Sequence, residues 1–179
     1  LHDADDEKFF ASIDNDNTRN ILFGVLPLSL QHITPEIIRM INATSFRKNA
    51  NHLDDAHGRL QEYQLIPRLA DRLEAIGDIG IKRCLIYSDT TGRPRWTLED
   101  LKTRPRNYAQ VKRMMSKQKL DDYLAGKKSA SAISHFTEKI LFVCDFTTQT
   151  SNGYLLLECD KRTGPIYEFL ISGDWNQTI

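Results

Sequence analysis

The residues best suited to catalysis or metal binding lie in the stretch FVCDFTTQTSNGYLLLECDKR, at positions 142 to 162. Its two apolar runs have the length and composition of strands, and acidic residues stand at their ends. Asp145 ends the first run, and Glu158 and Asp160 end the second, with Lys161 beside them. Carboxylates at neighbouring strand ends can hold Mg²⁺ or Mn²⁺ in a phosphodiester hydrolase, and a lysine there stabilises phosphoryl charge. A metal-dependent nuclease is therefore one hypothesis.

The geometry of the expected strands argues against a shared metal site. Side chains alternate between the two faces of a strand, so Glu158 and Asp160 share one face and Lys161 lies on the other. In the simplest hairpin register Asp145 points away from both acids, and a shift of one residue reverses that orientation. We therefore expect solvated strand ends, no bound metal and no catalytic residue. The nuclease remains the alternative, with His135 as a general base near Asp145 because histidine titrates near neutrality.

A second candidate metal site is the sequence HLDDAH at positions 52 to 57. On a helix, the spacing of three would pair His52 with Asp55 and Asp54 with His57, each pair offering a nitrogen and a carboxylate. The two pairs diverge around such a helix, and no third ligand can be named. We interpret the segment as the solvated face of an amphipathic helix. No GxSxG, GxGxxG, P-loop or kinase motif is present, which argues against the common acyl-transfer, dinucleotide-binding and nucleotide-hydrolysing classes.

Charge is distributed unevenly along a chain whose formal net charge is zero. Residues 1 to 16 contain six acids and Lys8 as the single cation, whereas residues 102 to 128 contain nine Lys or Arg and two acids. Zero net charge excludes a globally basic nucleic-acid binder, but a local basic surface remains compatible with one. Nine cations in such a short segment repel one another unless an anionic partner relieves them. The acidic N-terminal segment is an alternative, internal partner.

The basic segment is our main functional hypothesis. A predicted helix over 105–124 places Arg106, Arg113 and Lys117 on one outer face, and Tyr108 could stack on a nucleic-acid base. We expect a binding module that contacts an acidic protein surface or a nucleic acid, rather than an enzyme. The candidate binding residues are Arg104, Arg106, Tyr108, Arg113 and Lys117.

Hydrophobic periodicity predicts the elements that position these residues. Apolar residues at steps of three and four run through residues 50 to 76, with Pro67 as an expected kink. We predict an α+β fold, in which amphipathic helices pack on a mainly antiparallel sheet that ends in a C-terminal three-strand meander. The predicted helices are 35–43, 50–76 and 105–124, and the predicted strands are 81–87, 139–146, 153–160 and 166–171.

Length and composition predict the domain organisation and the compartment. We expect an acidic, partly flexible head over residues 1–20 and a single α+β domain over 21–179, helix-rich at 21–128 and strand-rich at 135–179. The longest apolar run is half the length that crosses a bilayer, so no transmembrane segment is expected. Three cysteines within apolar runs favour a reducing compartment, the cytoplasm. The chain begins with Leu1, and we expect it to be part of a larger chain or assembly.

Overall fold

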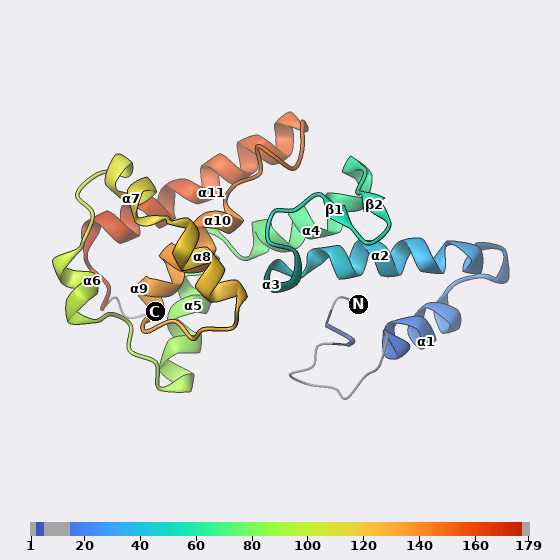
Figure 1. Cartoon of the computed structure of the whole chain (residues 1–179), viewed down its shortest axis with the longest axis horizontal. Helices are drawn as coiled ribbons and strands as arrows, with labels where there is room; N and C mark the ends of the chain where they lie inside the picture. The colour runs from blue at the N-terminus through green and yellow to red at the C-terminus, as the bar shows by residue number, and fades with distance from the viewer. Residues whose placement is uncertain (1–2, 6–14, 177–179) are drawn as a thin grey trace. The chain divides into compact units, whose positions relative to one another are not determined.

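Helices account for most of the chain in the computed structural model, which describes residues 3–5 and 15–176 (Figure 1). Contacts divide the chain into two compact units, residues 1–68 and 69–179, and the boundary falls inside helix α4 (Glu62–Glu74). The strands of the described residues are β1 (Asp54–Asp55) and β2 (Gly58–Arg59). The predicted α+β fold with a three-strand meander is therefore wrong, because the chain is mostly helical.

Unit 1 consists of several helices, a two-stranded hairpin and the first residues of α4 (Figure 1). The helix predicted at 35–43 is confirmed as α2, with Pro35 in its first turn, where a missing N–H costs nothing, and Glu36 beside the positive helix end. The elements of this unit before α4 are α1 (Asp16–Val25), the 3₁₀ helix η1 (Leu28–Ile33), α2 (Thr34–Thr44), α3 (Phe46–Asn49), β1 and β2.

Arg68 ties the end of α2 to the loop that precedes the hairpin. Its side chain is fully buried; Nε donates to the carbonyl of Ala43 at 2.7 Å and one terminal nitrogen donates to the carbonyl of His52 at 2.8 Å. The last carbonyls of a helix have no partner within the helix, so an arginine is well suited to satisfy them. Burial lowers the pKa of Arg68, because removal from water disfavours the charged form.

The helix predicted over 50–76 begins twelve residues late, at Glu62. Residues 54 to 59 instead form the β1–β2 hairpin, in which Asp54 pairs with Arg59 and Gly58 adopts a positive φ of 97°. Glycine tolerates that backbone conformation, which ends any helical path there. The apolar stripe predicted through this segment is confirmed at Leu69 and Leu73, which are buried, and is wrong at Tyr63 and Ile66, which are exposed. The other buried residues of this face of α4 are Leu65, Arg68 and Arg72.

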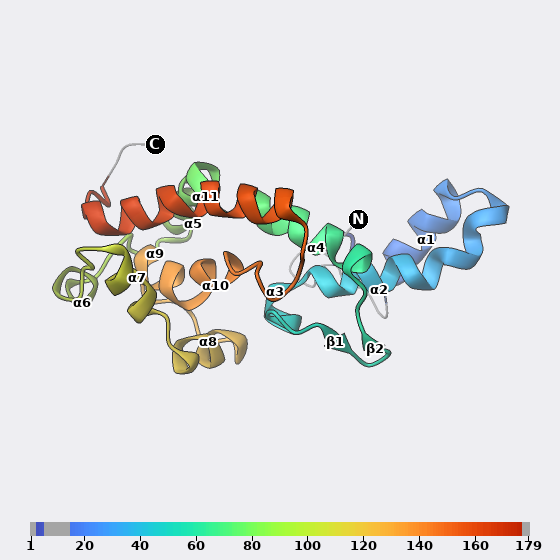
Figure 2. The same ribbon diagram turned by 90° about the horizontal axis from the view of Figure 1, so that it is seen from above.

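Unit 2 is organised around a C-terminal helix, α11 (Gly153–Ser172), which packs along α5 and α7 (Figure 2). With 20 residues α11 is long, but no helix within residues 3–5 and 15–176 is both long and apolar enough to cross a membrane. The other elements of this unit are α5 (Gly77–Thr91), α6 (Leu98–Lys102), α7 (Tyr108–Met114), α8 (Lys117–Leu124), α9 (Ala132–His135), the π-helix η2 (Phe136–Ile140) and α10 (Leu141–Val143).

The strand predicted at 81–87 lies inside α5. Its buried residues, Ile81, Cys84, Leu85 and Ser88, recur at steps of three, one and three, which is one face of a helix rather than the alternation of a strand. The strand predicted at 139–146 is also wrong, because this segment belongs to η2, α10 and the turn that follows.

The predicted strands 153–160 and 166–171 are both parts of α11. The expected hairpin turn before them is the start of this helix: Oδ1 of Asn152 accepts hydrogen bonds from the backbone N–H groups of Tyr154 and Leu155 at 3.0 and 3.2 Å. Asparagine serves turns and helix N-caps equally well, so its presence did not distinguish them. Pro165 lies within α11, where the sequence predicted a second turn. The segment expected to be strand-rich, 135–179, is thus helical.

A buried carboxylate holds α6 to α9. Asp100 accepts hydrogen bonds from the N–H and hydroxyl of Thr97, both at 2.7 Å, which closes the capping box of α6. It also accepts from the hydroxyls of Ser131 and Ser134 at 2.7 and 3.2 Å, where α9 begins. These hydrogen bonds hold α6 against the start of α9, and they thereby position the loop that follows α6.

Candidate anion-binding site

An open pocket of about 340 Å³ lies where the end of α6, the loop after it and α7 meet. Four of the eight residues that line the pocket are cationic, and none of the eight is acidic or aromatic. Its lining residues are Lys102, Thr103, Arg104, Pro105, Arg106, Gln110, Arg113 and Met114.

Local structure brings these residues together from a short stretch of sequence. Pro105 is buried and anchors the loop, and Asn107 then caps α7 by accepting a hydrogen bond from the N–H of Gln110 at 2.9 Å. Gln110 and Arg113 are one turn apart on α7, so both side chains lie on the same face of this helix. Arg106 precedes α7 and is linked to that face, because its N–H donates to Oε1 of Gln110 at 2.6 Å.

The cations of the pocket are not neutralised within the chain as the structure describes it. Among the described residues, no ion pair involves Lys102, Arg106 or Arg113, and Arg104 bonds only to the backbone carbonyl of Ile171, at 3.1 Å from Nε. The sequence contains no acid between Asp100 and Asp121. Uncompensated positive charge around a hollow creates a potential that attracts anions. Residues 1–2 and 6–14 of the acidic head lie outside the described residues, and residues 16–20, which were predicted to belong to that head, form the start of α1.

The structure places three of the five predicted binding residues in the pocket: Arg104, Arg106 and Arg113. Tyr108 does not line it; its ring packs edge-on against Tyr167, with 5.1 Å between centroids. The stacking role expected for Tyr108 therefore has no geometric support at this pocket. Lys102 and Gln110, which do line it, were missed, although Lys102 stands within the basic run that the sequence displays.

Lys117 lies on a different helix from Arg113, and Arg106 lies in the loop before both helices. The single helix predicted over 105–124 breaks at Met115, whose ψ of 123° is extended, and Ser116 caps the new helix α8. Lys117 pairs with Asp121 at 2.6 Å, one turn further along α8. The prediction that Arg106, Arg113 and Lys117 share one helix face is therefore wrong. Arg106 and Arg113 line the pocket, and Lys117 does not.

The carboxylates of the nuclease hypothesis have local partners instead of a shared focus. Oδ1 of Asp145 accepts hydrogen bonds from the N–H and the hydroxyl of Thr147 at 3.2 and 2.7 Å, a local pattern that is typical of turns. Glu158 pairs with Lys161 at 2.9 Å on α11, and this contact lowers the pKa of Glu158 by stabilising its charged form. Asp160 is exposed on the same helix.

His135, the proposed general base, contacts the hydroxyl of Ser129 through Nδ1 at 3.1 Å. Ser129 in turn donates to Glu138 at 2.5 Å, so the serine bridges the two side chains. Across residues 3–5 and 15–176, no group of three or more His, Cys, Asp or Glu side chains is arranged to hold a metal ion.

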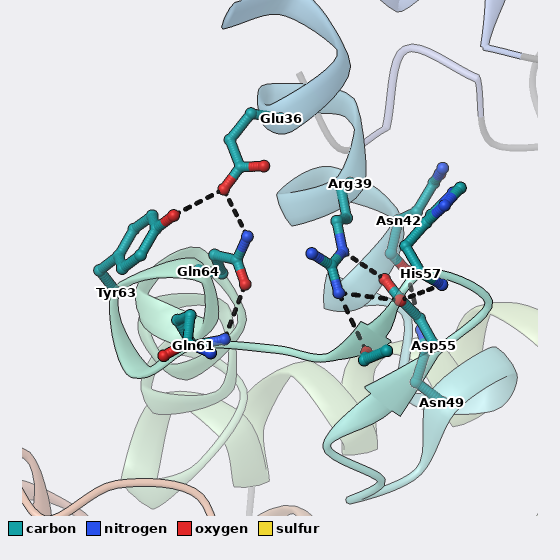
Figure 3. Close-up of polar contacts among 10 residues, drawn as sticks. Glu36, Arg39, Asn42, Asn49, Asp55, His57, Gln61, Tyr63 and Gln64 are labelled. Carbon is teal, nitrogen blue, oxygen red and sulfur yellow. Dashed lines mark hydrogen bonds and ion pairs between the residues drawn. The ribbon is translucent and has the colours of Figure 1, made fainter.

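A second polar cluster lies in unit 1, between α2 and the segment 55–64 (Figure 3). Arg39 makes two hydrogen bonds to Asp55, at 2.7 and 3.0 Å, and a third to the carbonyl of Gly58 at 3.0 Å. Glu36 accepts hydrogen bonds from the hydroxyl of Tyr63, at 2.9 Å, and from the side-chain amide of Gln64. We call these residues the α2 network.

Charges in the α2 network are matched by direct partners. The hydrogen bonds from Arg39 lower the pKa of Asp55, and those from Gln64 and Tyr63 lower the pKa of Glu36. His57 contributes its backbone N–H, which donates to Asp55 at 2.8 Å. The helical spacing on which the metal interpretation of residues 52–57 depended does not exist, because these residues lead into and form the hairpin. This cluster holds the hairpin against α2.

The fold and the pocket together define a predominantly helical protein with a candidate anion-binding site. The chain belongs to the same family as "Uncharacterized protein L803" of Acanthamoeba polyphaga mimivirus: 32% of 189 aligned residues are identical, covering 96% of this chain and 73% of the viral protein. No protein-family model matches the chain.

Proposed function

We propose that this protein is a binding module that uses the basic pocket between α6 and α7 to contact a polyanionic partner, a nucleic acid or the acidic surface of another protein. The observation that carries the proposal is the set of four pocket cations that have no acidic partner among the described residues. Gathering like charges without compensation raises the free energy of the unliganded protein, and a bound anion removes that repulsion.

The contrast with other surface cations supports this assignment. Lys117, Lys127 and Lys161 each pair with a carboxylate at 2.6 to 3.0 Å. Arg95 likewise pairs with Asp89 at 2.6 Å. These four cations of unit 2 have carboxylate partners, whereas none of the four pocket cations has one among the described residues.

A metal-dependent nuclease is not proposed. The hypothesis required Asp145, Glu158 and Asp160 at the ends of paired strands, and these strands are replaced by helices. Glu158 and Lys161, which would have shared the chemistry, neutralise each other on the surface of α11.

A reducing compartment such as the cytoplasm is proposed as the location. Cys84, Cys144 and Cys159 are all free thiols. Burial raises the pKa of the Cys84 thiol to about 11, so this residue is protonated and unreactive at neutral pH. Free cysteines that serve as small apolar side chains persist where disulfides do not form.

The proposal is tested by fluorescence anisotropy with a labelled single-stranded oligonucleotide of mixed sequence, titrated from about 50 to about 200 mM salt. Wild-type affinity should fall steeply with salt because bound cations release counterions from the phosphates. The variant Arg106→Ala/Arg113→Ala should bind about tenfold more weakly and reduce the slope of log K against log salt by about 2.

The matched control is Lys82→Ala/Lys128→Ala, which removes two exposed cations of unit 2 that do not line the pocket. Its affinity should remain within about threefold of wild type, because exposed cations that do not contact the ligand are screened by salt. Equal losses in the two variants would show that net charge, and not the pocket, governs binding. Absence of binding by wild type to both the oligonucleotide and polyglutamate would refute the proposed function.

A further inference from the structure

The pocket residue Arg104 lies against the C-terminal end of α11, which is remote from it in the sequence (Figure 1). Its Nε donates to the carbonyl of Ile171 at 3.1 Å. The last carbonyls of a helix have no partner within the helix, so a guanidinium is well suited to satisfy one of them. Arg104 thus contacts α11 through Nε, while its two terminal nitrogens have no partner among the described residues.

Gly173 provides the space that this guanidinium occupies. It is the C-cap of α11, with φ 69° and ψ 6°, in the left-handed region that favours glycine. A Cβ added at this position would come within 2.6 Å of Cζ and 2.7 Å of Nε of Arg104. Because these distances are shorter than a van der Waals contact, any side chain at position 173 must displace the guanidinium.

The turn that contains Gly173 is held by contacts of its own. Trp175 is 1% exposed, and its Nε1 donates to the carbonyl of Phe169 at 3.1 Å. The hydroxyl of Ser172 donates to the same carbonyl at 2.9 Å. Arg104, by contrast, is exposed and has a flexible side chain. An added side chain at position 173 would therefore move the guanidinium of Arg104 rather than the turn.

The position of this guanidinium matters for the pocket. Arg104 lines it together with Arg106 and Arg113, so its place decides how its charge lies relative to theirs. A side chain that is already held in one position loses less conformational entropy on binding than a free one does. No residue of α11 lines the pocket, yet the end of this helix is what holds Arg104 there.

We infer that Gly173 is a positioning residue of the anion-binding site, which holds the guanidinium of Arg104 at the pocket and makes anion affinity depend on the end of α11. This inference rests on the proposed function and identifies what sets the geometry of the site. It applies to phosphate and carboxylate ligands alike, because the arginine donates to either group in the same way.

The test compares Gly173→Ala with the matched control Gly92→Ala. Gly92 is the C-cap of α5 and has the same φ of 69°, but a Cβ added there would have no non-neighbouring atom within 4 Å. Both variants place a Cβ in the left-handed region, so each should lower the thermal midpoint by roughly 3 °C.

Binding should separate these two variants. Each is titrated at one salt concentration with the labelled oligonucleotide and with labelled polyglutamate. For a probe that wild type binds, Gly173→Ala should bind about fivefold more weakly, because Arg104 is displaced from the pocket. Gly92→Ala should stay within about twofold of wild type, because it imposes the same backbone strain without touching a pocket residue.

Two further variants separate the displacement of Arg104 from other effects. Arg104→Ala should by itself weaken binding about fivefold, and in that background Gly173→Ala should have little further effect, since no guanidinium is left to displace. Gly173→Asn also carries a Cβ, but asparagine tolerates the left-handed conformation better than alanine does. Its thermal midpoint should be nearer to that of wild type, and its affinity should be as low as that of Gly173→Ala.

Each contrary result has a distinct meaning. Equal affinities of Gly173→Ala and Gly92→Ala would overturn the inference while the proposed function stands. Additive losses from Gly173→Ala and Arg104→Ala would also overturn it, because position 173 would then act through the fold rather than through the arginine. Wild-type affinity in Gly173→Asn would show that backbone strain, and not the added Cβ, weakens binding. Failure of wild type to bind either probe would remove the proposed function, and this inference with it.

Discussion

The α2 network and the basic pocket use the same kinds of side chain in opposite ways. In the network, Arg39 meets Asp55 through two hydrogen bonds and Glu36 meets two donors. In the pocket, three arginines and a lysine gather without an acid among the described residues. Charges that are paired inside the chain stabilise its fold, whereas charges left unpaired remain available for a ligand.

The two units differ in overall charge in the same direction. Unit 1 contains seven Lys or Arg and ten Asp or Glu, whereas unit 2 contains 17 and 14. The zero net charge of the chain therefore conceals a negative and a positive half. Within the positive half, the excess is concentrated in the acid-free segment between Asp100 and Asp121, which contains every cation of the pocket.

The largest effect on stability is expected at Arg68, the most deeply buried cation of unit 1. Arg68→Ala should lower the free energy of unfolding by about 3 kcal/mol, because it leaves the buried carbonyl of Ala43 without its donor, removes the hydrogen bond to the carbonyl of His52 and opens a cavity. Urea unfolding followed by circular dichroism measures the change. A loss below about 0.5 kcal/mol would mean that water replaces the guanidinium and that Arg68 does not stabilise the fold.

A smaller loss of stability, which depends on pH, is expected at Asp55. Asp55→Ala should cost about 1 kcal/mol at neutral pH. Because Arg39 lowers the pKa of Asp55 from 3.8, the stabilisation is fully present above the unfolded-state pKa and is lost as pH falls through the lower folded-state pKa. Unfolding of wild type and variant between pH 7 and pH 2 should therefore converge at the acidic end. Parallel curves would contradict this assignment.

The smallest change in stability is expected in the pocket. Arg106→Ala/Arg113→Ala should change the free energy of unfolding by less than about 0.5 kcal/mol, or raise it slightly, because repulsion is relieved and no internal partner is lost. Marked destabilisation of the double variant would show that Arg106 and Arg113 stabilise the fold.

The oligonucleotide affinity of the wild type should be constant between about pH 5.5 and 8.5, since the pocket lining contains no histidine or carboxylate that titrates there.

Several features were predictable because their causes are local. The start of α2 follows from Pro35 and Glu36, which favour the first turn of a helix whatever surrounds it. Arg104, Arg106 and Arg113 were candidates because a run of cations is visible in the sequence itself. Their grouping in one pocket needed only a short loop and one helical turn.

Strand assignments failed where short apolar runs fit either element. IKRCLIY at 81–87 is rich in β-branched and aromatic residues, yet its buried side chains follow the period of α5. Asn152, which precedes the predicted strand 153–160, caps the start of α11, and Pro165, which separates that strand from the one predicted at 166–171, lies inside the same helix. The helical period of the buried side chains is recognisable only when the residues that pack against a neighbouring element are known.

By itself, the sequence determined the charge separation, the acid-free basic run and the signals for local helix starts, because these depend on neighbouring residues alone. The tertiary structure decided that α11 is one helix, that Tyr108 faces Tyr167, and that Lys117 leaves the basic surface through the break at Met115. It also decided which cations are paired, since Arg39 finds Asp55 across 16 residues while Arg106 finds no acid among the described residues. The physical reason is that pairing depends on distance in space, and distances of a few ångströms between remote residues are set by packing.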